Sequence, residues 1–101
     1  MTRLEMIRFL QDTAETIQQY AKDISELRAY KANPRDRELD LYVQKCYNSA
    51  YNIYQFVNQY KAISDDEFQS INTQNQCRTY RTHLLSMKIA YDTYMKKWQR
   101  R

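Results

Sequence analysis

Hydrophobic residues recur along most of the chain at alternating steps of three and four, the spacing of one face of an α-helix. Three stretches show this rhythm, about 3 to 31, about 34 to 61 and 77 to 98. The first carries Ile7, Leu10, Ala14, Ile17, Ala21 and Ile24. The second carries Leu39, Val43, Cys46, Ala50, Ile53, Val57 and Tyr60, and the third Cys77, Tyr80, Leu84, Met87, Tyr91, Tyr94 and Trp98. Short loops make successive helices antiparallel neighbours. The pattern therefore predicts an all-α fold, an antiparallel three-helix bundle with long helices, with residues 1–101 as one domain.

Short polar motifs mark where the predicted helices begin. Thr2 with Glu5, and Ser64 with Glu67, have the spacing of a capping box, in which side chains bond the free amides of the first turn. At 33–34 the chain reads Asn-Pro, a capping residue followed by proline at the first helical position. These motifs predict helix starts near residues 3, 34 and 65.

The hydrophobic rhythm slips within residues 72–76, so Phe68 and Ile71 do not share the face that runs from Cys77 to Trp98. One alternative is a single helix from 65 to about 98, continuous or with a kink. The other is a short extra helix that ends near 72, followed by a new one. We expect the continuous or kinked helix. A continuous helix would place Cys46 and Cys77 at nearly the same level of the bundle. A break would shift the two cysteines relative to each other by several residues.

The composition limits both the core and the chemistry. Leu, Ile, Val and Phe make up only 19 of the 101 residues, so we expect most of the ten tyrosines to pack in the core with their hydroxyls at its rim. Glycine is absent, which excludes phosphate-binding loops, dinucleotide fingerprints and the nucleophile elbow. Two cysteines make no disulfide framework, and neither a signal peptide nor a membrane-spanning stretch is visible. We therefore expect a cytoplasmic protein without a membrane partner.

A neutral surface is predicted on the second helix. Phe56 falls outside the hydrophobic face of that helix, among Asn52, Gln55 and Gln59, where an exposed helix would normally carry charged pairs. An aromatic side chain within uncharged polar surroundings is typical of a protein interface. We expect Phe56 to face outward and to contact a partner protein, although a compositional bias towards Asn, Gln and Tyr would give the same pattern.

A second surface is predicted on the last helix. Leu85 and Ile89 point more than 100° away from its hydrophobic face. Basic residues surround them, namely Arg78, Arg81, Lys88 and Lys96. Residues 78–101 hold seven Lys or Arg against one Asp, and the whole chain has a net charge of +4. Such a surface could dock an acidic amphipathic protein or a second copy of this chain, or bind nucleic acid through its phosphates. Solvated charge without a partner would give the same pattern, and the last basic residues also complement the negative end of the helix.

Few residues favour catalysis. His83 is the only histidine, and its spacing from the two cysteines does not suit a metal site, so we expect neither metal nor cofactor. Arg78 and His83 have the Arg-x4-His spacing that resembles the signature of HEPN-domain ribonucleases, which are all-helical and often dimeric. The resemblance covers six residues and departs from the family at Thr79. It would imply metal-independent RNA cleavage by an arginine and a histidine that are usually paired across a dimer.

The hypothesis that the sequence favours is a small non-enzymatic protein-binding module, an adaptor, inhibitor or accessory factor. It would act by steric docking of its helical faces and could self-associate into a homo-oligomer. A basic helical bundle that binds nucleic acid is the alternative, and a HEPN-like ribonuclease comes third.

Overall fold

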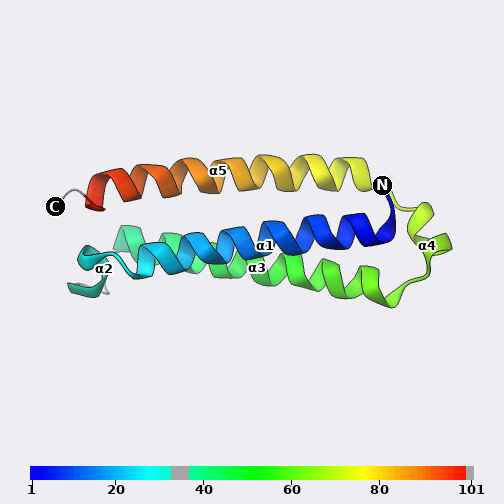
Figure 1. The fold of residues 1–101 in the computed structure, drawn as a ribbon, viewed down its shortest axis with the longest axis horizontal. Coiled ribbons are helices and arrows are strands. Elements are labelled where there is room, and N and C mark those ends of the chain that lie inside the picture. The colour runs from blue at the N-terminus through cyan, green and yellow to red at the C-terminus, as the bar shows by residue number, and fades with distance from the viewer. Residues whose placement is uncertain (33–36, 100–101) are drawn as a thin grey trace.

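A computed structural model describes residues 1–32 and 37–99, and this part of the chain contains helices and no strands. The three long helices are α1 (Arg3–Ser25), α3 (Arg37–Ala62) and α5 (Thr73–Gln99). Two short helices lie between them in the chain, α2 (Arg28–Ala32) and α4 (Asp65–Gln69). The long helices run side by side in alternating directions, and the bundle measures 53 × 20 × 17 Å (Figure 1). The predicted three-helix bundle is confirmed.

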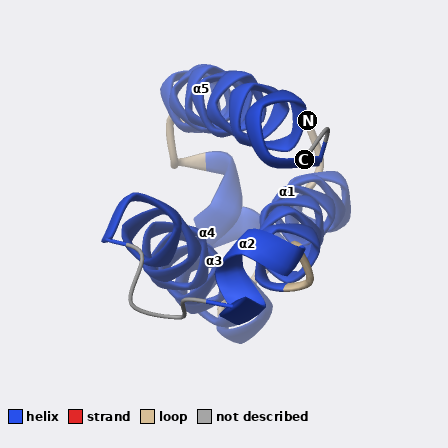
Figure 2. Cartoon of the chain, turned by 90° about the vertical axis from the view of Figure 1, so that its left-hand side faces the viewer, coloured by secondary structure: helices blue, strands red, loops and turns tan. Residues whose placement is uncertain are grey.

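The core lies mainly between α1 and α3. Every residue of the predicted hydrophobic faces of these two helices is buried. Alanine and cysteine stand at several of the contact positions, and small side chains let two helices approach closely. By contrast, Cys77 and Met87 are the buried residues of α5, and the rest of its inner face is only half-buried. The half-buried residues of that face are Tyr80, Leu84, Tyr91, Tyr94 and Trp98. Viewed from the α2 end, the three long helices form a triangle (Figure 2).

The helix predicted to run to about residue 31 is interrupted, so that prediction is wrong in its length. α1 ends at Ser25, and the chain turns at Glu26 and Leu27 before α2 begins. Ser25 Oγ donates a hydrogen bond to the Ala21 carbonyl 2.7 Å away, an interaction that competes with regular helix bonding. Within the turn, Leu27 is buried against the core. The turn thus lets the chain change direction without exposing Leu27.

The expected continuous or kinked helix from residue 65 is also wrong, because α4 ends at Gln69 and α5 starts at Thr73. The short-helix alternative is the one observed. Phe68 is buried edge-on against Tyr60, with ring centroids 5.5 Å apart. The break removes the phase conflict, because α4 and α5 can each turn their own apolar side towards the core.

The two cysteines lie at different levels of the bundle, as expected for a broken helix. Cys77 lies beside the start of α1, with its Sγ 3.5 Å from Met6 Sδ. Tyr60, near the end of α3, donates to the side chain of Gln76 at the start of α5. Cys46 lies fourteen residues before Tyr60 on α3, and it therefore sits much further along the bundle.

Two of the predicted helix starts can be compared with the structure. Thr2 and Glu5 form a complete capping box at α1, with both bonds 3.1 Å long. Ser64 caps α4, where its hydroxyl accepts from the Glu67 amide at 3.1 Å. The predicted Asn-Pro start at 33–34 lies outside the described residues.

Candidate docking surfaces

The outer face of α5 exposes two large aliphatic side chains. Leu85 is 58% exposed and Ile89 is 60% exposed. They lie one turn apart on the side of α5 opposite Met87, which is buried against α3. The predicted exposure of both residues is confirmed. Their role in binding stays a prediction.

Basic side chains surround this apolar pair. Arg78, Arg81, Lys88 and Lys96 are all exposed, and Asp92 is the one acidic residue of α5. The Arg81 guanidinium lies 5.3 Å from the centre of the Phe9 ring on α1, a cation–π contact that holds this arginine at the α1 edge of the face. We name the surface formed by Arg78, Arg81, Leu85, Lys88, Ile89 and Lys96 the α5 outer face. It carries a positive charge around an apolar centre.

Phe56 does not face outward as the sequence predicted. It is half-buried between α3 and α5, with its ring centroid 6.1 Å from that of Tyr80. The physical reason is that α5 packs on this side of α3 and brings an aromatic partner over the ring. The amides predicted to surround it are exposed, namely Asn52, Gln55 and Gln59. Phe56 thus contributes to the bundle, and the neutral face of α3 lacks the outward aromatic anchor expected of it.

The tyrosines divide between the core and the surface. Tyr42 and Tyr60 are buried, whereas Tyr47 is 48% exposed and Tyr51 is 65% exposed. Six more tyrosines are partly buried and pack against the core, namely Tyr20, Tyr30, Tyr54, Tyr80, Tyr91 and Tyr94. The expectation that most tyrosines pack in the core is therefore confirmed, with Tyr47 and Tyr51 as the exceptions. These two are exposed because α1 and α5 flank α3 on other sides and leave their positions open.

His83 forms a contact between helices. Its Nε2 lies 2.9 Å from Ser49 Oγ on α3, beside a shallow pocket that Phe56 and Tyr80 also line. Burial, together with repulsion from Lys45, lowers the pKa of His83 below its ordinary value. A neutral imidazole next to a serine hydroxyl can accept its proton, but both residues lie within long helices whose backbone amides are already bonded. No backbone amide of these helical segments is therefore free to stabilise an oxyanion, although the side-chain amides of Asn52 and Gln55 line the same pocket.

Arg78 and His83 point in different directions in this chain. His83 faces α3, whereas Arg78 lines a pocket with Met1 and Gln74 at the α1 side of α5. The two side chains of the HEPN-like spacing therefore do not meet within one molecule. In addition, no three His, Cys, Asp or Glu side chains of the described residues gather closely enough to hold a metal ion.

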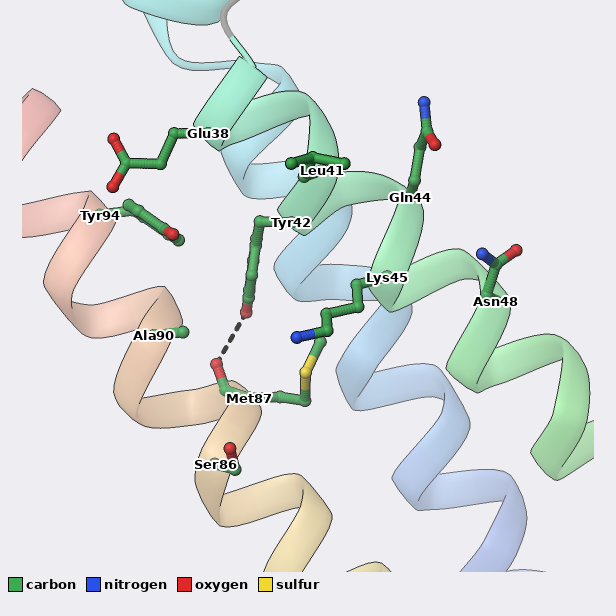
Figure 3. A pocket seen from close by; sticks show the side chains of 10 residues that line it. All are labelled: Glu38, Leu41, Tyr42, Gln44, Lys45, Asn48, Ser86, Met87, Ala90 and Tyr94. Carbon is green, nitrogen blue, oxygen red and sulfur yellow. Dashed lines mark hydrogen bonds between the residues drawn. The ribbon is translucent and has the colours of Figure 1, made fainter.

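A groove between α3 and α5 escaped the sequence analysis. It has a volume of about 460 Å³, and Tyr42, Met87, Ala90 and Tyr94 supply its apolar surface (Figure 3). Tyr42 spans the groove, and its hydroxyl donates to the Met87 carbonyl at 2.7 Å. Leu41, which is 55% exposed, forms part of the wall. The signal in the sequence was Leu41 itself, a leucine that falls outside the hydrophobic face of its helix.

Searches against family models, curated proteins and solved structures find no significant match to this chain. Among the described residues, no helix has the length and apolar character needed to cross a bilayer.

Proposed function

We propose that this protein is a small non-enzymatic protein-binding module, an adaptor, inhibitor or accessory factor that docks by the α5 outer face. The observation that carries the proposal is the exposure of Leu85 and Ile89, one turn apart, at the centre of a basic surface. An isolated bundle gains nothing from two aliphatic side chains in water, and contiguous apolar surface with a polar rim is typical of interaction sites.

The neutral face of α3 supports the proposal less well. Its anchor, Phe56, already packs against Tyr80 and Tyr60 within the bundle. What remains there is an exposed set of amides, and the exposed aromatic ring nearest to it is Tyr51, one turn before Gln55, which carries a polar hydroxyl.

The test compares capture of a partner by wild-type protein and by a Leu85→Glu/Ile89→Glu variant, in extract of the native host. Both residues are exposed, so the variant should keep its helical CD spectrum and lose the captured protein. A Tyr47→Glu/Tyr51→Glu variant is the matched control, because it also places two charges at exposed apolar positions, on another face. A photo-crosslinker at Thr82 should form a crosslink to the protein that the wild type captures, and a photo-crosslinker at Asn58 should not. Equal capture by all three proteins would contradict the proposal.

Binding of nucleic acid is the second candidate function, and the charge of α5 favours it. Arg78, Arg81, Lys88 and Lys96 are available on one face for contacts with phosphates. Titration with duplex DNA and with RNA at increasing salt separates this function from protein docking, because phosphate contacts give an affinity that falls steeply with salt. Absence of binding at low salt would remove it. A HEPN-like ribonuclease rests on the six-residue resemblance alone, because Arg78 and His83 face different sides of α5 and would have to meet across a dimer.

A further inference from the structure

We infer that the ligand of the α5 outer face is an acidic amphipathic helix of another protein, and not a second copy of this chain. This inference rests on the proposed function and specifies the chemistry of its partner. It draws on the spacing of the exposed residues of α5, on their charges, and on the way α5 is already packed.

The exposed residues of α5 repeat with the spacing of a coiled-coil seam. Along the outer side they follow steps of four and three, through Arg78, Thr82, Leu85, Ile89, Asp92 and Lys96. All of these residues are exposed. The inner side of the same helix has its own seam, from Cys77 to Trp98. α5 therefore has the spacing to pack on two sides, inward against α1 and α3 and outward against one further helix.

A second copy of this chain fits the outer seam poorly in both orientations. In a parallel pair each residue of the seam meets its own counterpart, so Arg78 faces Arg78 and Lys96 faces Lys96. In an antiparallel pair that sets Leu85 against Ile89, Arg78 faces Lys96 of the other copy. Like charges at facing positions destabilise helix pairs. The two apolar residues alone cover about one heptad, which is too little to offset this repulsion.

An acidic helix removes the repulsion and keeps the apolar contact. The seam from Arg78 to Lys96 spans about 27 Å at 1.5 Å per residue, the length of a partner helix of five turns. Such a helix would place aliphatic residues against Leu85 and Ile89 and carboxylates against the flanking basic side chains. Asp92 is the acidic residue of the seam, so it requires a neutral or basic residue opposite it. This requirement fixes the register of the partner helix.

Nucleic acid fits the centre of the surface less well. The positions nearest the middle of the face are aliphatic, whereas phosphate contacts need donors there. The basic residues stand around Leu85 and Ile89 and not between them. This arrangement matches a ligand with an apolar stripe and acidic flanks.

The test uses two synthetic amphipathic peptides with Leu at the central seam positions and Glu at the flanking ones, written in opposite chain directions. A third peptide has the same composition in scrambled order. Fluorescence anisotropy should show that wild-type protein binds one of the first two, with affinity at least tenfold above that for the scrambled peptide. Leu85→Ser/Ile89→Ser and Lys88→Glu/Lys96→Glu should each weaken binding at least tenfold, whereas Tyr47→Ser/Tyr51→Ser should leave it unchanged.

Several outcomes would overturn the inference. If the scrambled peptide binds as tightly as the amphipathic peptides, charge alone accounts for their binding. A dimer in sedimentation experiments that dissociates on Leu85→Ser/Ile89→Ser would identify a second copy as the ligand. Binding of duplex DNA that depends on Lys88 and Lys96 but not on Leu85 and Ile89 would identify nucleic acid. If neither peptide binds up to millimolar concentration while capture of the host protein still depends on Leu85 and Ile89, the proposed function stands and the acidic helix is wrong.

Discussion

Removal of the Tyr42 hydroxyl tests how α5 is held against α3. Tyr42 is buried, its hydroxyl donates to the Met87 carbonyl at 2.7 Å, and its ring meets Tyr94 edge-on with centroids 5.3 Å apart. The Tyr42→Phe change deletes the hydrogen bond to Met87 and the hydroxyl's contact with the Cys46 thiol, and keeps the ring. Because so little of α5 is fully buried, we expect a measurable part of its attachment to depend on this bond.

The magnitude follows from what the deletion leaves behind. Met87 lies inside α5, so its carbonyl still accepts the intrahelical bond from the residue four positions ahead. The Met87 carbonyl is therefore not left without a donor, and the Cys46 thiol, which loses the hydroxyl beside it, is only a weak hydrogen-bonding group. The loss should be close to the net value of one hydrogen bond, about 0.5–1.5 kcal/mol. In a domain of this size, each kcal/mol corresponds to about 4–8 °C in Tm.

Urea unfolding followed by far-UV CD gives the free energy of unfolding, and amide hydrogen exchange locates the change. Relative to wild type, Tyr42→Phe should have faster amide exchange in α5. The exchange rates of α1 and α3 should increase less. Tyr47→Phe is the control, since this tyrosine is 48% exposed and should shift stability by less than about 0.5 kcal/mol. If both variants match wild type in stability and in exchange, the Tyr42 hydroxyl does not hold α5 in place.

Two further predictions concern the titratable groups between the helices. Because the folded state lowers the pKa of His83, stability should be complete above its unfolded-state pKa of about 6.5 and should fall as the pH drops towards the lower folded-state pKa. His83→Gln should flatten this part of the curve of urea midpoint against pH, and an unchanged slope would show that another group causes it. Burial raises the pKa of the Cys46 thiol to about 11, so in a Cys77→Ser variant a disulfide reagent at pH 8 should label Cys46 only as fast as the protein opens. Labelling at the rate of a free thiol would contradict the burial of Cys46.

The α5 outer face was visible in the sequence, whereas the groove beside it was not. Leu85 and Ile89 stand far from the hydrophobic face of their own helix, so helical periodicity alone predicted that they are exposed. Phe56 was predicted wrongly by the same rule, because the residue that covers it, Tyr80, comes from another helix. The groove likewise needs Tyr42 of α3 and Ala90 of α5 together.

The sequence by itself determined the three long helices, the faces that α1 and α3 bury, and the caps at Thr2 and Ser64. These features depend on residues within one turn of each other, so local periodicity and hydrogen bonding predict them. The tertiary structure alone decided where the chain breaks before α5, how deeply α5 is buried, and which side chains cover Phe56. Those features depend on the distance and register between helices, which are set by side chains far apart in the chain that meet only when the bundle forms.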